Sequence, residues 1–210
     1  MTLDDEIKIY LPKYLSADNY ETLIKELEDF PRNMDGRMYT SIVEENIICQ
    51  GDVLKDMPYA EIDHLENGII NKDCIVLSNT CDIDLNNERL FKSRIMYAPL
   101  IELSKYKRVL LAHKAGTEQQ INDHINSIKE QRISQILYLP QTRTMNESIV
   151  FLDKVLNIDN RSIDRLTLKE RRLVSLSDYG FYLLLFKISV HFCRLQEHVN
   201  RGTNKLKEVN

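Results

Sequence analysis

The stretch "CIVLSNTCDID", residues 74–84, changes character abruptly in its middle. Its first part, from Cys74 to Leu77, is apolar without alternation, which predicts a strand that is buried on both faces. The rest is mostly small and polar, and it brings one thiol and two carboxylates together in the sequence. Loops that follow buried strands are where a rigid scaffold presents functional groups. The stretch therefore predicts either a site or an ordinary strand end.

Short strand-like runs flank this stretch on both sides. Turn signals separate them, and they read "IVEENIICQGDVL", "SRIMYAPLIEL", "SQILYLPQ", "ESIVFLDKV" and "RRLVSLS". Several short strands spaced by turns favour a small barrel or sandwich over a parallel α/β sheet. One inserted helix is expected to begin after Thr117, which forms a capping box with Gln120. The apolar face of that helix is made by Ile121, Ile125 and Ile128.

Helices are also expected at both ends of the chain. Asp18 and Glu21 form a capping box before apolar residues at helical spacing, which are Tyr20, Leu23, Ile24, Leu27 and Phe30. Ser177 or Asp178 is expected to cap the last helix. The first half of that helix is apolar almost all round, which predicts burial on more than one side. The expected organisation is an N-terminal helical arm (1–37), a barrel with a helical insertion (38–176), and a C-terminal helix and tail (177–210).

The composition is that of an ordinary globular protein. The chain has 210 residues, of which 43% are hydrophobic and 29% charged, enough for one sizeable core. A net charge of -4 disfavours a dedicated nucleic-acid binder, although it leaves room for a local basic patch. The acidic start, "MTLDDE", lacks the features of a signal peptide, and no apolar stretch is long enough to cross a membrane. We therefore expect a cytoplasmic protein with reduced thiols.

The polar half of the opening stretch supplies the candidate catalytic residues Thr80, Cys81 and Asp82. Carboxylates beside a thiol raise its pKa, so Cys81 needs a nearby cation to act as a nucleophile. The candidates for this cation are Arg89, Arg94, His64 and His113, of which we select Arg89 and Arg94 as the expected catalytic residues. The same loop supplies the candidate binding residues Ser78, Asn79 and Asp84. The alternative is that Thr80 and Asp82 form an Asx or Ser/Thr turn, with Cys81 packed inward as a small hydrophobe.

A basic run further along the chain is a second candidate binding surface. Lys105, Lys107 and Arg108 surround an aromatic residue, an arrangement that suits a phosphate backbone and a stacked base. The alternative is a solvated face beside an apolar run. The four cysteines include no CxxC pair, and no Cys/His spacing fits a zinc template. No metal and no cofactor is therefore expected.

Three segments resemble, in the same order, the strands of the PemK/MazF-type toxins. They are Gly51-Asp52-Val53, residues 75–79 with the sequence "IVLSN", and Tyr97-Ala98-Pro99-Leu100. The resemblance covers roughly a quarter of the chain. It implies a small SH3-like barrel of the kind that cleaves RNA as a dimer. The segment "VLSNTCDI" also resembles a "VLSxTCDI" pattern found in uncharacterised bacterial proteins, which implies no particular activity.

The chain departs from that toxin family at the catalytic positions. Lys72, Asp73 and Cys74 stand where the family has an Arg-Pro whose arginine is catalytic, and Ile101 stands near the place of its catalytic Thr or Ser. A lysine can replace the cation, but isoleucine cannot replace a hydroxyl. We therefore expect an α+β protein with an SH3-like barrel, acting as a binding or adaptor protein of a bacterial toxin-antitoxin or phage-defence system.

The expected partner of such a protein is another protein, with RNA or DNA and a second copy of the chain as further partners. The alternative function is a nuclease-like enzyme, an endoribonuclease, with a rearranged site in the loop of residues 78–84. In that case the loop supplies the reacting groups, and one of the two arginines stabilises the charge on the phosphate.

Overall fold

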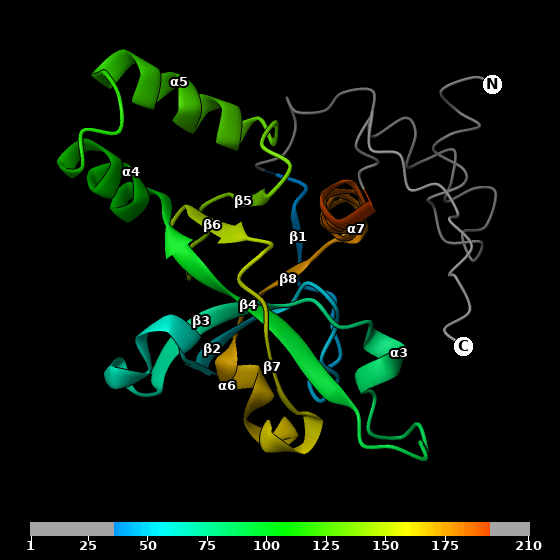
Figure 1. Ribbon diagram of the computed structural model, residues 1–210. Helices are drawn as coiled ribbons and strands as arrows, with labels where there is room; N and C mark the ends of the chain where they lie inside the picture. The colour runs from blue at the N-terminus through cyan, green and yellow to red at the C-terminus, as the bar shows by residue number, and fades with distance from the viewer. Residues whose placement is uncertain (1–35, 194–210) are drawn as a thin grey trace, which may run out of the picture.

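The computed structural model describes residues 36–193, which form an α+β fold with a mostly antiparallel sheet (Figure 1). The described strands are β1 (Tyr39–Thr40), β2 (Val53–Tyr59), β3 (Ile70–Val76), β4 (Arg94–Glu102), β5 (Ile136–Leu139), β6 (Ser148–Phe151), β7 (Leu156–Asp159) and β8 (Arg172–Leu176). The described α-helices are α3 (Thr80–Ile83), α4 (Leu103–Ala112), α5 (Glu118–Lys129), α6 (Leu168–Arg171) and α7 (Asp178–Cys193). Short 3-10 helices are η1 (Ile62–Asn67), η2 (Asn160–Ser162) and η3 (Arg165–Thr167). The helices expected before residue 36 lie outside the described residues.

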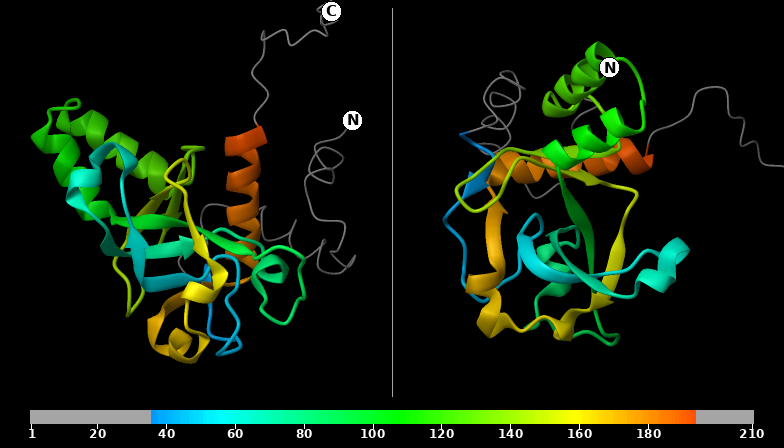
Figure 2. Two further views of the ribbon diagram at one scale, coloured as in Figure 1. Left: turned by 60° about the horizontal axis from the view of Figure 1, so that its bottom comes forward. Right: turned by 90° about the vertical axis from the view of Figure 1, so that its left-hand side faces the viewer.

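The eight strands form one curled sheet that remains open. Its order is β1-β8-β2-β3-β4-β6-β5, and β7 also pairs with β4. The end strands β1 and β5 do not pair with each other, so the closed barrel that we expected is not found. Side chains bridge the two edges instead, since the Tyr39 hydroxyl donates to the Pro140 carbonyl at 2.8 Å and the Thr144 hydroxyl to the Leu173 carbonyl at 2.9 Å. Figure 2 shows the resulting curvature.

The centre of the sheet is buried on both faces, as the apolar run at Cys74 predicts. Ile75 and Ala98 point into a main core, whereas Cys74, Val76 and Tyr97 point into a second core. The β3–β4 register pairs Cys74 with Pro99 and Val76 with Tyr97. The opening stretch therefore begins as a central strand with no free face.

Two helices, rather than one, are inserted between the sheet strands β4 and β5. The capping box at Thr117 is confirmed, and it starts α5, which buries Ile121, Ile125 and Ile128. We had not predicted α4, because its basic residues suggested a surface run. Its inner face is apolar all the same: Leu103 is buried, and Tyr106 and Leu110 pack against the main core. β7 was also missed as a separate strand, because a turn after Phe151 divides it from β6.

A buried ion pair joins the start of β2 to β8. Asp52 is fully buried and its carboxylate accepts hydrogen bonds from the Cys49 amide at 2.9 Å, from Arg172 Nε at 3.0 Å and from the Ser175 hydroxyl. The Arg172 side chain is only 8% exposed. Gly51 precedes this aspartate at φ +91°, and a Cβ on it would lie 2.6 Å from the Leu176 side chain. Glycine is therefore required beside the buried carboxylate.

Arg172 also holds the segment before β2. It donates to the carbonyls of Glu44 and Ile47 in addition to Asp52. Burial raises the pKa of Asp52. The hydrogen bonds that its carboxylate accepts and the positive charge of Arg172 lower this pKa and so offset part of the increase. The pair thus fixes an irregular segment that has few strand hydrogen bonds of its own.

We predict that Arg172→Met lowers the free energy of unfolding by roughly 3–5 kcal/mol, because it leaves the Asp52 carboxylate buried without its cation. The matched control is Lys169→Met, which breaks an ion pair with Glu45 whose side chains are 71% and 62% exposed. The control is expected to lose far less, because solvent screens an exposed ion pair. Urea unfolding monitored by circular dichroism measures both changes, and equal losses would contradict the central role of the buried pair.

The last helix, α7, begins at a serine cap and buries a lysine. The Ser177 hydroxyl accepts a hydrogen bond from the Gly180 amide at 3.2 Å, so Ser177 rather than Asp178 is the cap. Lys187 is 3% exposed and its ammonium donates to the carbonyls of Gln131 at 2.9 Å and Ile133 at 2.5 Å. Burial lowers the pKa of Lys187 from 10.5 to about 8. No helix among the described residues is long and apolar enough to cross a membrane.

The lowered pKa of Lys187 predicts a stability that rises with pH. Between about pH 8 and pH 10.5 the unfolded chain holds this proton and the folded chain does not, so raising the pH favours folding. The neutral amine keeps two N–H donors for its two carbonyl partners. Across this window the wild type is expected to gain stability relative to Lys187→Met. Urea unfolding of both proteins at pH 7.5 and pH 10 measures the gain, and a constant difference would refute the assignment.

Candidate functional site

The polar half of the opening stretch begins with residues that fasten the end of β3. The Ser78 hydroxyl accepts a hydrogen bond from the Met96 amide at 2.7 Å and donates to the Arg94 carbonyl at 3.4 Å. The Leu77 amide donates to the Met96 carbonyl at 2.8 Å. Ser78 is itself buried. Its hydroxyl therefore extends the strand pairing and is not presented to a ligand.

The next residues form α3, a single helical turn. The Asn79 side chain caps it by accepting a hydrogen bond from the Cys81 amide at 2.9 Å. The Thr80 hydroxyl accepts one from the Gln50 amide at 2.9 Å, and the Gln50 side chain in turn donates to the Leu77 carbonyl at 2.8 Å. The turn is thus an Asx cap made by Asn79, one residue earlier than the alternative placed it. Cys81 is exposed, so the expectation that it packs inward is wrong.

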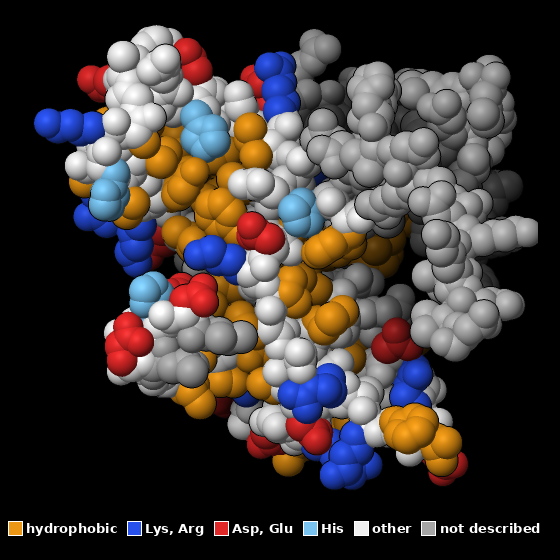
Figure 3. Space-filling view, in the orientation of Figure 1, with side chains coloured by type: hydrophobic (Ala, Val, Ile, Leu, Met, Phe, Trp, Pro, Cys, Tyr) orange, Lys and Arg blue, Asp and Glu red, His pale blue; other side chains and the backbone are white. Residues whose placement is uncertain are grey.

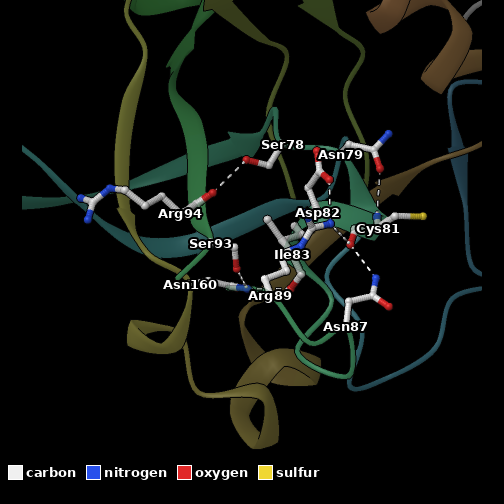
Figure 4. Close-up of polar contacts among 10 residues, drawn as sticks. All are labelled: Ser78, Asn79, Cys81, Asp82, Ile83, Asn87, Arg89, Ser93, Arg94 and Asn160. Atoms are coloured by element: carbon white, nitrogen blue, oxygen red, sulfur yellow. Dashed lines mark hydrogen bonds and ion pairs between the residues drawn. The ribbon is translucent and has the colours of Figure 1, made fainter. Parts of the chain in front are cut away.

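Of the two candidate arginines, Arg89 is the one that reaches this turn. Its Nη2 donates to the Asp82 carboxylate at 2.8 Å and to the Cys81 carbonyl at 3.0 Å, and the Asn87 amide donates to the same carbonyl at 2.7 Å (Figure 4). Arg94 does not join them. Its side chain points away from the turn and donates to the side chain and backbone of Asn157 on β7.

The base of the loop is held by residues that the sequence did not single out. The buried Asn160 side chain donates at 2.8 Å to the Ile83 carbonyl and at 2.8 Å to the Ser93 hydroxyl. Its own side-chain oxygen accepts a hydrogen bond from Arg165, which also donates to the Ile163 carbonyl at 2.8 Å. Burial lowers the pKa of Arg165, and Asp84 opposes this effect. These residues follow Ile83 by about eighty positions, so no local pattern could have revealed them.

The loop between α3 and β4 ends in exposed apolar side chains. Leu90 is 93% exposed, Phe91 79% and Leu85 50%. In Figure 3 apolar side chains protrude over this loop at the lower right. The loop and the start of η2 enclose a shallow hollow of about 110 Å³, whose lining includes Asp84, Arg89, Lys92, Asp159 and Arg161. The signal in the sequence is the pair Leu90-Phe91 inside an otherwise polar stretch.

The basic run lies elsewhere on the molecule. Lys105, Lys107 and Arg108 belong to α4, which lies at the opposite end of β4 from the loop (Figure 1). Lys105 forms an ion pair with Glu102 at 2.7 Å. The two groups of candidate residues therefore do not form one site.

The thiols of Cys49 and Cys74 are unsuited to nucleophilic chemistry. Burial raises the pKa of Cys74 to about 12. The pKa of Cys49 is also raised, mainly by burial and in addition by the negative charge of Asp52. Within residues 36–193 no three His, Cys, Asp or Glu side chains gather closely enough to hold a metal ion. Among Cys49, Cys74 and Cys81, the exposed thiol is that of Cys81.

Comparison with known proteins adds no assignment. No protein-family model matches this chain, and no curated protein matches it.

We predict that Asn160→Ala destabilises the protein by roughly 2–3 kcal/mol, because the buried Ile83 carbonyl loses its 2.8 Å donor and Arg165 loses one of its acceptors. The matched control is Asn157→Ala, which removes an exposed partner of Arg94 and is expected to change stability by less than about 1 kcal/mol. Thermal unfolding measures both. Comparable losses in the two variants would show that Asn160 does not fix the base of the loop.

Proposed function

We propose that this chain is a binding or adaptor protein that holds a protein partner with the α3–β4 loop, which we define as residues 84–93. The observation that carries the proposal is the exposure of Leu90 and Phe91 at the tip of this loop. Burying a leucine and a phenylalanine in an interface is favourable, because it removes their apolar surface from water. Aromatic anchors of this kind dominate the binding energy of many protein interfaces.

The bracing of the loop supports the same function. Arg89, Asn87 and Asn160 join the loop to α3 and to η2 by hydrogen bonds at 2.7–3.0 Å. A loop that is already ordered loses less conformational entropy when it binds a partner. The neighbouring charges are of both signs, since Glu88 and Lys92 flank the apolar pair. This composition suits the polar rim around a small apolar interface.

The resemblance to the PemK/MazF-type toxins is the basis for the architecture and the biological setting that we propose. We propose that the curled sheet is an SH3-like half-barrel, supported by the Tyr39 and Thr144 bridges between its edges. The setting would then be a bacterial toxin-antitoxin or phage-defence system. The catalytic positions of the family support binding rather than catalysis. Lys72 stacks on the Tyr59 ring at 4.0 Å, and Ile101 packs against the main core.

The endoribonuclease alternative has less support. The Thr80 hydroxyl serves a backbone amide, and Arg89 is paired with Asp82. Arg94 is held by Asn157 on another strand. A nuclease site of this composition would need these groups directed at a phosphate.

The test places a photo-crosslinking amino acid at position 91 in the full chain, expressed in its native host. The matched control places it at Leu166, which is 86% exposed on η3. We expect a discrete protein adduct from position 91 that is absent from position 166 and is lost when Leu90→Ser is added. The same adducts from both positions would contradict the proposal.

A second assay separates the two functions. The purified protein, with Cys81→Ala and Asp82→Ala in parallel, is incubated with single- and double-stranded RNA and DNA, with and without divalent metal. Cleavage by the wild type that both variants lose would overturn the binding proposal in favour of the nuclease. Absence of cleavage together with the adduct from position 91 is the expected result.

A further inference from the structure

The helix α7 has its polarity reversed relative to an ordinary surface helix. Lys187, the one charged residue between Tyr179 and Val190, is buried at 3% exposure. Phe186 and Phe192, by contrast, are 58% and 61% exposed. A surface helix normally directs its charge to water and its large apolar side chains to the core. The arrangement indicates that the outward side of α7 is an interface.

The outward side forms a continuous stripe along the helix. Its members recur at helical spacing and are Tyr182, Leu185, Phe186, Ser189 and Phe192. The inward side, with Leu183 and Leu184, packs on the main core, and α7 contacts β5 and β8. Figure 2 shows α7 at one side of the sheet with no other described element on its outward side. We call this stripe the outer face of α7.

We infer that residues 18–30 of the same chain pack on the outer face of α7. The sequence predicts that this segment is a helix with one apolar face, formed by Tyr20, Leu23, Ile24 and Leu27. That face needs a partner as much as the outer face of α7 does. The two stripes are matched in length, since helices of 13 and 16 residues measure about 20 and 24 Å.

The place where the described chain begins favours this occupant. Arg37 and Met38 contact the start of α7, because their carbonyls accept hydrogen bonds from the side chain and amide of Ser177. Residues 31–36 reach at most about 20 Å when extended. The end of the segment is therefore tethered close to the start of α7, which would set the two helices antiparallel.

The tether also decides between this segment and a second copy of the chain. A short linker gives an effective concentration in the millimolar range, whereas separate copies meet at the much lower concentration of the free protein. An intramolecular partner with a matching stripe therefore occupies the outer face first. Dimerisation through this face would require the segment to leave it.

The test uses the full chain with Phe186→Trp, since the sequence has no tryptophan and the variant has a single indole signal. We expect blue-shifted emission and weak quenching by acrylamide. Adding L23S and L27S is expected to shift the emission to the red and to raise the quenching constant several-fold. The matched control adds K25S and D29S on the opposite side of the segment, which leaves the net charge unchanged and is expected to alter neither signal.

Two results would overturn the inference. One is an indole in the F186W chain that acrylamide quenches as readily as free tryptophan, a measurement that needs no destabilising change. The other is shielding that weakens on dilution of the protein, because it would assign the outer face to a second copy. Far-UV circular dichroism checks that the L23S/L27S chain is folded. If it is not, the quenching of the F186W chain alone and its dependence on concentration decide.

Discussion

Asp52 and Arg172 stand 120 residues apart in the chain, and their ion pair joins the second strand to the last one. A carboxylate with no exposed surface is tolerated only when its hydrogen-bonding capacity is filled. Cys49, Arg172 and Ser175 fill it here. Since the same guanidinium also holds the carbonyls of Glu44 and Ile47, one interaction fixes both the sheet pairing and the irregular segment before β2.

This constraint extends to the candidate site. Gln50 lies two residues before Asp52, and its amide and side chain hold Thr80 and the Leu77 carbonyl. The Gly51 amide donates to the Val76 carbonyl at 2.8 Å. The turn that begins α3 is therefore positioned from the same segment that the ion pair holds. Ser78, Asn79 and Thr80 build this connection, whereas Cys81 and Asp82 are exposed at its outer end.

The loop beyond α3 and the outer face of α7 share one physical feature. Each exposes large apolar side chains next to polar groups that have been drawn inward, Asn160 in one case and Lys187 in the other. Asn160 fixes the base of a loop, which gives the exposed pair Leu90-Phe91 a defined position. Lys187 satisfies the carbonyls of Gln131 and Ile133, which keeps α7 against the sheet while its other side stays apolar.

Elements whose signals are local could be predicted from the amino-acid sequence. The buried strand at Cys74, the capping box at Thr117 and the start of the last helix at Ser177 or Asp178 depend on neighbouring residues, so their patterns could be recognised. The open sheet, the contact of Arg89 with α3 and the turning away of Arg94 became evident only from the folded chain. The orientation of Arg94 depends on Asn157, and the base of the loop depends on Asn160; each of these asparagines lies more than sixty positions away from its partner. Hydrogen bonds between such distant residues leave no periodic trace in a single sequence, because any polar residue can supply a donor once folding has brought it into place.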